Sequence, residues 1–325
     1  MKLNFINFNK YLNKKYTFEN KPKVAVAISG GPDSMALIFL VNKYIKKIKG
    51  NTIALVIDHN LRKNSSYESR WTQDILKKNK INCKILRVNN SQIKKKNMNE
   101  ARVNRYKLIT NFCKKNHIMH LFVGHHKDDN IETFLFRKIA GSDFEGLQSI
   151  KEISLIDSLN LIRPLLNFSK KSIYEFNKKN KIPFIEDPTN INLNFTRPVI
   201  RNFLKKQNLF FLDKIEKKFS LIIKKLPLYK FMINKILIKN IVELNSKFIK
   251  LNYYEFISND DLIIEKLIKN IYTYLTHENA KLRSKKIEIL INLLKVKDFN
   301  KFILKKIAIY KIDDFLVLSQ KTHQN

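Results

Sequence analysis

The feature that most constrains the fold of this chain is a strand, a glycine-rich loop and a helix, which residues 24–42 predict together. The apolar run Val24–Ile28 leads directly into Ser-Gly-Gly-Pro-Asp-Ser at residues 29–34, and an apolar helical pattern follows. Gly30 and Gly31 let the backbone approach a ligand closely, because neither has a Cβ atom. The free N–H groups and the positive dipole end of the helix N-terminus favour an anion there. The segment therefore predicts a phosphate site at the end of a buried strand.

The loop differs from the Walker phosphate-binding loop, because no Gly-Lys-Ser or Gly-Lys-Thr follows it. Ser29 and Ser34 offer hydroxyl groups that donate hydrogen bonds. Asp33 carries a negative charge that would repel a phosphate unless a cation lay between the two. The loop therefore predicts a nucleoside triphosphate that binds together with Mg²⁺.

Strand and helix patterns alternate over about the first 165 residues. Short apolar runs predict strands at Val24–Ile28, Thr52–Ile57, Cys83–Val88, His120–Val123 and Leu161–Ile162. Helical patterns lie near Ser34–Lys49, Tyr67–Asn79, Asn99–His117 and Asp128–Ile139. This alternation predicts an α/β fold, a doubly wound parallel sheet with helices on both faces. We expect the strand order 3-2-1-4-5, which makes the first and fourth strands neighbours.

The second part of the chain has a different pattern, because long helices rich in Lys, Ile and Leu begin at about Phe203. Residues 302–318 alternate well enough to predict a hairpin around Asp313–Asp314. We therefore expect two domains, an α/β domain at residues 1–205 and a smaller, mainly helical domain at residues 206–325.

Composition narrows the partners and the compartment. The net charge of +35 favours an anionic partner, nucleic acid first, although a lysine-rich composition alone would also raise the charge. The two cysteines, Cys83 and Cys113, form no Cys-x-x-Cys pair, which argues against a zinc site, an iron–sulfur cluster and a disulfide framework. No apolar stretch is long enough to span a membrane. We therefore expect a cytoplasmic protein with no membrane contact.

A second motif, His125–Thr133, reads His-His-Lys-Asp-Asp-Asn-Ile-Glu-Thr and follows Gly124 at the end of the fourth predicted strand. Its carboxylates, here called the acidic cluster, fall within one helical turn and are Asp128, Asp129 and Glu132. Acidic residues in a first turn also serve only to complement the helix dipole. Two of the chain's seven histidines lie beside them, however. Metal binding, ammonium recognition and general-base chemistry are all open to this cluster, whereas its spacing fits zinc poorly.

The predicted strand order places the two motifs at one edge of the sheet. In doubly wound sheets a ligand lies beyond the carboxyl ends of the strands, where the strand order reverses. The glycine-rich loop after the first strand and the acidic cluster after the fourth would face each other at that point. A phosphate cradle opposite carboxylates predicts a site for Mg²⁺ and a nucleotide, with room for a second substrate.

Residues 29–34 resemble the PP-loop of the N-type ATP pyrophosphatases, which cleave ATP between its α- and β-phosphates. Further segments resemble one family among them, the tRNA(Ile)-lysidine synthases, over about residues 20–205. The segments that carry this resemblance are Asp58–Arg62 with Ser65 and Glu68, Ala101–Tyr106, His125–Thr133, Gly141–Ser142 with Gly146–Leu147, Arg163–Leu166, Glu186–Asn190, and Arg197 with Arg201.

The resemblance implies an enzyme that uses ATP and free L-lysine to convert the first anticodon cytidine of an isoleucine tRNA with a CAU anticodon to lysidine. The C2 oxygen of the cytidine would attack the α-phosphate and release pyrophosphate, and the lysine ε-amine would then attack C2 and release AMP. The modified tRNA would read AUA instead of AUG and carry isoleucine instead of methionine. Residues 1–205 would form the PP-loop catalytic domain, and residues 206–325 a helical tRNA-binding domain.

The same resemblance implies a role for each site residue. The residues that would bind ATP are Ser29, Gly30, Gly31, Pro32, Asp33 and Ser34. The catalytic residues would be Asp33, His125, Asp128, Asp129 and Glu132. Asp33 and Asp129 would be ligands of Mg²⁺, whereas Asp128 and Glu132 would bind the lysine ammonium or take its proton. The residues that would contact phosphate or tRNA, if they are not ordinary surface arginines, are Arg105, Arg197 and Arg201.

Alternatives stay open beside this interpretation. A related PP-loop tRNA thiolase is the nearest one, although thiolases with an iron–sulfur cluster need paired cysteines. A non-catalytic RNA-binding protein is another, against which the complete carboxylate set argues. The sequence does not decide between a monomer and a homodimer, nor which carboxylate deprotonates the lysine, nor how tRNAs are discriminated. It departs from the family pattern at Asn60, Ala140, Asp143 and Pro198.

Overall fold

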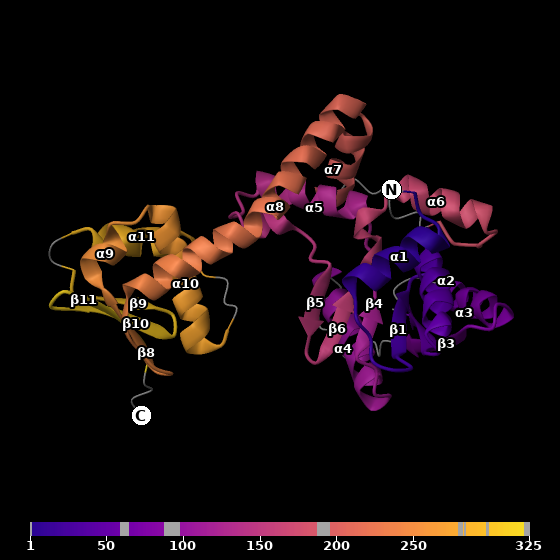
Figure 1. The fold of residues 1–325 in the computed structure, drawn as a ribbon, viewed down its shortest axis with the longest axis horizontal. Helices are drawn as coiled ribbons and strands as arrows, with labels where there is room; N and C mark the ends of the chain where they lie inside the picture. The colour runs from indigo at the N-terminus through magenta and orange to yellow at the C-terminus, as the bar shows by residue number, and fades with distance from the viewer. Residues whose placement is uncertain are drawn as a thin grey trace. The chain divides into compact units, whose positions relative to one another are not determined.

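The computed structural model describes residues 2–58, 65–87, 98–186, 196–278, 282, 284–296 and 299–321. The chain divides into two compact units, Met1–Ile222 and Ile223–Asn325. Helix α8 (Leu209–Asn240) crosses this division (Figure 1). The domain boundary expected at residue 205 lies at the end of helix α7 (Thr196–Lys205), earlier in the chain than the division.

The first unit is built on a six-stranded sheet with the order β3-β2-β1-β4-β6-β5. Its strands are β1 (Lys23–Ile28), β2 (Asn51–Asp58), β3 (Asn82–Arg87), β4 (His120–Phe122), β5 (Ile153–Ile156) and β6 (Leu159–Ile162). All neighbouring strands pair in parallel except β5, which forms an antiparallel hairpin with β6. The expected α/β fold and its strand order are confirmed, with β6 as the fifth predicted strand. The edge strand β5 was not predicted.

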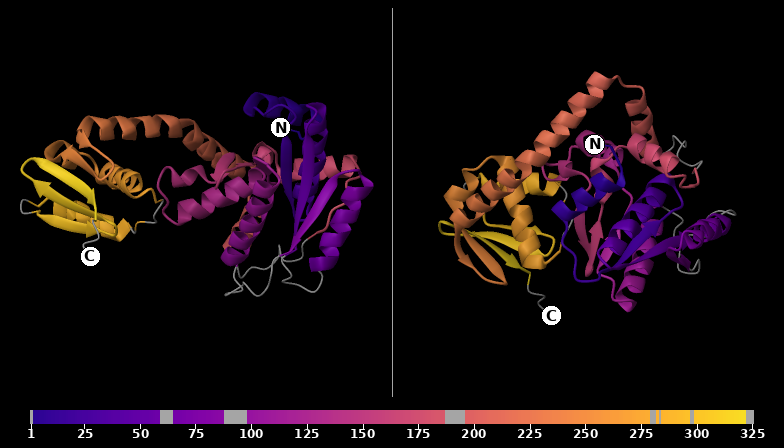
Figure 2. Two further views of the ribbon diagram at one scale, coloured as in Figure 1. Left: turned by 90° about the horizontal axis from the view of Figure 1, so that it is seen from below. Right: turned by 45° about the vertical axis from the view of Figure 1, so that its right-hand side comes forward.

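Helices cover both faces of this sheet (Figure 2). The helices before α7 are α1 (Phe5–Lys15), α2 (Pro32–Lys47), α3 (Ser65–Lys78), α4 (Met98–Lys115), α5 (Lys127–Ile139) and α6 (Lys170–Lys179), with short 3₁₀ turns at Gly146–Gln148 and Pro164–Asn167. Because side chains alternate along a strand, Val24 and Val26 of β1 pack into one core with α1, α2, α3 and α6. Ala25 packs into the other core, against α4. Helix α5 packs instead against Ile215 of α8.

The second unit combines helices with a five-stranded antiparallel sheet, in the order β7-β8-β11-β10-β9. Its strands are β7 (Ile241–Leu244), β8 (Phe248–Asn252), β9 (Lys301–Leu304), β10 (Ile307–Ile312) and β11 (Phe315–Gln320). Its helices after α8 are α9 (Tyr253–Ile257), α10 (Asp261–Thr276) and α11 (Ser284–Leu294). Leu251 of β8, Leu267 of α10 and Leu316 of β11 lie in its core and are fully buried.

The structure confirms the hairpin around Asp313–Asp314, which joins β10 to β11. The expectation of long helices between about Phe203 and the hairpin is wrong at β7 and β8. Both strands carry Ile and Leu side chains, as the helices beside them do, so composition could not separate the two. None of the described helices is both long and apolar enough to cross a membrane.

Candidate active site

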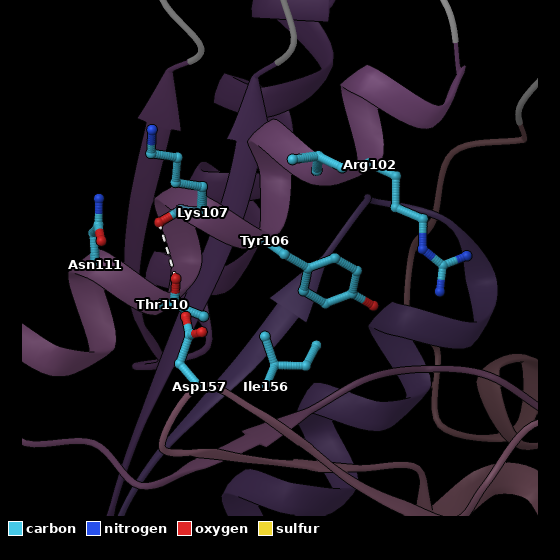
Figure 3. A pocket seen from close by; sticks show the side chains of 8 residues that line it. Arg102, Tyr106, Lys107, Thr110, Asn111, Ile156 and Asp157 are labelled. Carbon is cyan, nitrogen blue, oxygen red and sulfur yellow. Dashed lines mark hydrogen bonds between the residues drawn. The ribbon is translucent and has the colours of Figure 1, made fainter. Parts of the chain in front are cut away.

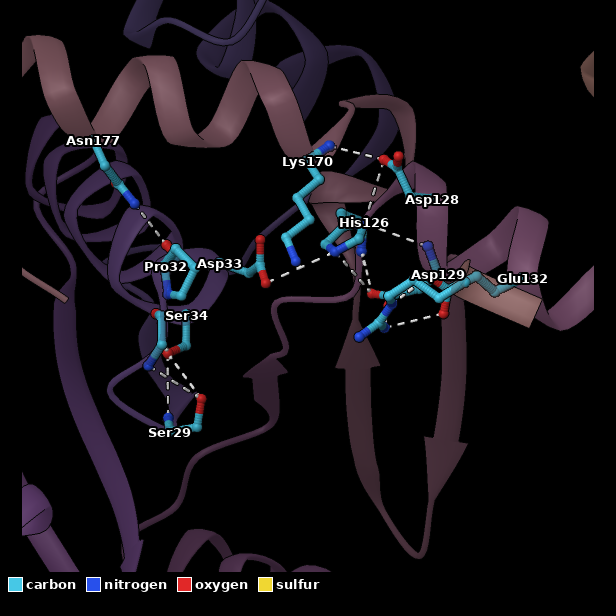
Figure 4. A network of polar contacts seen from close by, with 12 residues as sticks. Ser29, Pro32, Asp33, Ser34, His126, Asp128, Asp129, Glu132, Lys170 and Asn177 are labelled. Atoms are coloured by element: carbon cyan, nitrogen blue, oxygen red, sulfur yellow. Dashed lines mark hydrogen bonds and ion pairs between the residues drawn. The ribbon is translucent and has the colours of Figure 1, made fainter. Parts of the chain in front are cut away.

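The glycine-rich loop joins β1 to α2 and is held in shape by its own hydrogen bonds (Figure 4). The N–H of Ser29 donates to Ser34 Oγ (3.2 Å), which in turn donates to the carbonyl of Gly31 (3.0 Å). Gly30 has a φ of +81°, which side-chain-bearing residues rarely adopt, and a Cβ there would lie 2.8 Å from Thr72 Oγ1. The loop therefore needs glycine at position 30, and it leaves the N-terminus of α2 pointing into the site.

The second motif lies against this loop because Gly124 lets the two backbones meet. Strands β1 and β4 are neighbours, and Val26 pairs with Phe122. A Cβ on Gly124 would lie 3.2 Å from the backbone carbon of Asp33 and 3.2 Å from the nitrogen of Ser34. The structure thus brings the loop and the acidic cluster to one edge of the sheet, where the sequence analysis expected them.

His126 links the two motifs, although sequence reasoning did not select it. It is the N-cap of α5: its Nδ1 accepts from the N–H of Asp129 (3.3 Å), and Asp129 Oδ2 accepts from the N–H of His126 (3.0 Å). Its Nε2 lies 3.8 Å from Asp33 Oδ2 and 3.5 Å from Asp129 Oδ2. Nε2 therefore lies between the two carboxylates. Burial lowers the pKa of His126, but Asp128, Asp129 and Asp33 together raise it above its ordinary value.

Asp33 has the features of a group that needs a cation. Burial has the largest influence and raises the pKa of Asp33, while the charge of His126 lowers it less. Its Oδ1 is buried and has no hydrogen-bond partner among the described residues. A hard cation such as Mg²⁺ would supply the missing partner, so the carboxylate fits that ion. In the described part of the chain no group of three or more His, Cys, Asp or Glu side chains could hold a metal. The protein would therefore supply only some of the ligands of Mg²⁺, and phosphate oxygens would supply others.

Glu132 of the acidic cluster is held by Arg201 of α7. The Nε and Nη2 atoms of Arg201 donate to the two carboxylate oxygens of Glu132 over 2.7 and 3.0 Å. The same guanidinium lies 3.9 Å from Asp129 Oδ1. Glu132 is buried, with 5% of its surface exposed. The structure thus places Arg201 against the carboxylates, and its predicted contact with tRNA stays a prediction.

Asp128 is the most accessible member of the acidic cluster, with about half of its side chain exposed. Its Oδ2 accepts a hydrogen bond from the backbone N–H of Lys170 (2.8 Å) and lies 3.6 Å from His126 Nδ1. Burial alone would raise the pKa of Asp128, but these two neighbours lower it further than burial raises it. Asp128 is therefore an ionised carboxylate with room for a cationic ligand.

His125 contacts Arg163 on the other side of the motif. Its Nδ1 accepts from Arg163 Nε (3.2 Å), and Arg163 also donates to the carbonyl of Lys151 (2.7 Å). Burial lowers the pKa of His125 to about 4, and nearby arginines favour the neutral ring as well. Arg105 lies on this side too, 5.2 Å from the centre of the Tyr106 ring. The catalytic role of His125 and the tRNA contact of Arg105 stay predictions.

A shallow hollow of about 550 Å³ lies along α4, separate from the loop and the acidic cluster (Figure 3). Its lining includes Arg102, Tyr106 and Thr110 of α4 and Asp157 of the β5–β6 turn, but none of the predicted site residues. Its walls carry both positively and negatively charged side chains. Because none of the predicted site residues lines this hollow, we place the site at the loop.

Some predicted residues lie outside what the structure describes. Arg197 falls within α7, but its side chain is not among the described ones. The segments 59–64 and 187–195, which include parts of two matching motifs, lie outside the described residues. Of the departures from the family pattern, Asp143 has a visible role, because its Oδ1 accepts from the N–H of Gly146 (2.7 Å) and closes a turn.

Lys170 is a further residue of the site that sequence reasoning missed. It begins α6, and its side chain extends towards Asp33 and His126 (Figure 4). It stands 42 residues after Asp128, with which its N–H is hydrogen-bonded. Nothing in a chain so rich in lysine distinguishes this one from the others.

The sequence pattern of the PP-loop domain matches residues 4–208 of the chain. A tRNA(Ile)-lysidine synthase of Orientia tsutsugamushi (strain Boryong) is 34% identical over 221 residues, which are 66% of this chain and 50% of that protein. The tRNA(Ile)-lysidine synthase of Wolbachia pipientis wMel is 38% identical over 202 residues, 61% of this chain and 46% of that protein. The chain thus spans about half the length of the curated relatives it matches.

Among solved structures, a U34-tRNA thiolase from Methanococcus maripaludis with its 4Fe–4S cluster has a TM-score of 0.56 at 20% identity, over 68% of this chain and 80% of that one. At this identity the likeness concerns the fold alone. The PP-loop match, by contrast, covers more than half of the chain and contains both the glycine-rich loop and the acidic cluster. The chain belongs to the PP-loop domain family.

Proposed function

We propose that the chain is an ATP-dependent ligase that joins free L-lysine to C2 of the first anticodon cytidine of an isoleucine tRNA with a CAU anticodon. One observation carries this proposal: the glycine-rich loop and the acidic cluster meet at the carboxyl ends of two adjacent parallel strands. The names of the sequence relatives, tRNA(Ile)-lysidine synthases, support the choice of substrate. The net charge of +35 suits a tRNA partner, and we expect the enzyme to act in the cytoplasm, where tRNA is used.

In the first step, the loop and the N-terminus of α2 bind the phosphates of ATP through backbone N–H groups. Asp33 and Asp129 would hold Mg²⁺, which when bound neutralises charge on the phosphate oxygens. The C2 oxygen of the cytidine attacks the α-phosphorus, and the bond to the β-phosphate oxygen breaks. Pyrophosphate leaves with the electron pair, and C2 becomes electrophilic because its oxygen now carries AMP.

In the second step, the lysine ε-amine must be neutral to attack C2, although its free pKa is about 10.4. We propose that Asp128 binds the incoming ammonium, because Asp128 is accessible and ionised, whereas Glu132 is already paired with Arg201. The amine then forms the new bond to C2, and AMP departs with the former cytidine oxygen.

A tRNA thiolase is the alternative on the same fold, and the cysteines make it the weaker one. The chain has two cysteines, and both are free. Burial raises the pKa of Cys83 to about 11 and that of Cys113 to about 12, so neither is a ready thiolate. A sulfur carrier or an iron–sulfur cluster would need a more acidic thiol, and more of them.

AMP release tests the proposal. The protein is incubated with ATP, a transcript of the isoleucine tRNA and lysine, and each component is left out in turn. We expect AMP to form only when all three are present, and a matched transcript with uridine at the first anticodon position to give none. AMP release that does not need lysine, or none with the complete mixture, would overturn the proposal.

A further inference from the structure

Helix α6 forms a third wall of the site, and hydrogen bonds hold it there. Ser169 caps the helix by accepting from the N–H of Ser172 (3.3 Å), and the N–H of Lys170 donates to Asp128 Oδ2 (2.8 Å). Further along the helix, the buried Asn177 donates from Nδ2 to the carbonyl of Pro32 in the loop (2.9 Å). Helix α6 is thus fixed to the acidic cluster at its start and to the loop near its end, so the position of Lys170 is not that of a free surface lysine.

The ammonium group of Lys170 lies inside the site. Its side chain extends between Asp33 and His126 in Figure 4, and its Nζ lies 5.7 Å from the centre of the Tyr174 ring. No carboxylate of the described residues lies within 4.0 Å of this ammonium, so no ion pair among them neutralises its charge. The positive charge of Lys170 acts on Asp33 over a longer distance, because it lowers the pKa of Asp33, which burial raises.

The loop itself has no cation to offer a nucleotide. Residues 29–34 contain one charged side chain, the carboxylate of Asp33, and the lysine of a Walker loop is missing. A bound triphosphate carries several negative charges, of which one metal ion neutralises two. A further cation fixed by the protein is therefore expected close to the loop, and Lys170 is the side chain that the structure places there.

We propose that Lys170 binds the phosphate groups of ATP and supplies from α6 the positive charge that the loop lacks. When the bond between the α- and β-phosphates breaks, the electron pair stays on the leaving pyrophosphate, and the ammonium stabilises that growing charge. The inference rests on the proposed function only for the use of ATP. It adds a catalytic residue to that function and is independent of the second substrate.

The test compares Lys170→Met with Lys171→Met, which removes the same charge from an exposed position on the same helix. The probe is α,β-methylene-ATP with Mg²⁺, which cannot be cleaved between its first two phosphates, and adenosine serves as the uncharged probe. Loss of a charge-assisted hydrogen bond predicts binding of the analogue about 10- to 100-fold weaker in Lys170→Met. Adenosine binding should stay unchanged, and Lys171→Met should bind both probes as the wild type does. Lys170→Arg should restore most of the affinity.

Each other outcome counts against the proposal. Equal binding of the analogue by Lys170→Met and the wild type would overturn it, and so would an equal loss in Lys171→Met. A parallel loss of adenosine binding would mean that Lys170 only shapes the site. If Lys170→Met fails to fold, Lys170→Gln replaces it in the same comparison. The assay contains neither tRNA nor lysine, so a wild type that binds the analogue but adds no lysine would contradict the proposed function alone.

Discussion

The ion pair between Arg201 and Glu132 fixes α7 to α5, and its removal tests how the acidic cluster is held. The two side chains share two hydrogen bonds of 2.7 and 3.0 Å. Their exposure is unequal, since 24% of the Arg201 side chain and 6% of the Glu132 side chain are accessible. Arg201→Met therefore leaves a buried carboxylate without its partner, whereas Glu132→Gln leaves a guanidinium that still reaches water.

This difference in exposure sets the expected magnitudes. Removing one partner of a fully buried pair costs about 3–5 kcal/mol, and a fully exposed pair contributes about 0–1 kcal/mol. With one partner buried, we expect Arg201→Met to lower the free energy of unfolding by about 2–3 kcal/mol and Glu132→Gln by about 1 kcal/mol. The double variant should lose less than the sum of the two, with a coupling energy of about 1–2 kcal/mol.

Urea denaturation measures these changes, because the one tryptophan of the chain, Trp71, lies in α3 of the first unit and its fluorescence follows that unit. Lys217→Met is the matched control: it breaks an ion pair with Asp213 (2.6 Å) that is exposed on both sides. We expect this control to change stability by less than about 0.5 kcal/mol. A loss in Arg201→Met no larger than in the control, or a coupling energy near zero, would refute the reasoning.

Three further predictions concern single residues. Asp33→Asn should abolish release of pyrophosphate in an ATP–pyrophosphate exchange assay but leave tRNA affinity in a filter-binding assay near the wild-type value, because the charge serves Mg²⁺; retained exchange would remove that role. Gly124→Ala should lower the free energy of unfolding by about 1–2 kcal/mol, because its Cβ would lie 3.2 Å from backbone atoms of Asp33 and Ser34; an unchanged urea midpoint would contradict the close approach. The native state resists protonation of His125, whose pKa is about 4 against an ordinary 6.5, so stability falls as the pH drops through this window. His125→Gln should therefore lose about 2–3 kcal/mol less than the wild type between about pH 7 and about pH 4.5, and equal losses in the two proteins would show that the ring is not held neutral.

The parts of this fold that local patterns determine could be predicted from the sequence. Apolar runs separated by helical patterns gave the five parallel strands and their order, because the sheet buries both faces and leaves little choice of pairing. The edge strand β5 was not found, because its side chains alternate in exposure and its sequence is too short to stand out. Strands β7 and β8 were missed because they are only four and five residues long and carry isoleucine and leucine, as the neighbouring helices do.

The candidate site shows the same limit at the level of single residues. The loop and the acidic cluster are local motifs, so their meeting followed from the strand order alone. Lys170 and Arg201 reach the cluster from helices far along the chain. No local sequence pattern indicates which side chain of such a helix points towards the site. Sequence reasoning selected Arg201 as a phosphate or tRNA contact, which stays a prediction, but found neither its ion pair with Glu132 nor Lys170.

The most direct test of the central claim is mass spectrometry of the anticodon nucleotide after incubation of the tRNA transcript with the protein, ATP and isotope-labelled lysine. The account predicts that the label appears on the first anticodon cytidine with the wild type and is absent with Asp33→Asn. It also predicts that a transcript with uridine at that position acquires no label. An unlabelled cytidine with the wild type, or a label elsewhere in the tRNA, would contradict the claim that the loop and the acidic cluster together form a lysine-adding site.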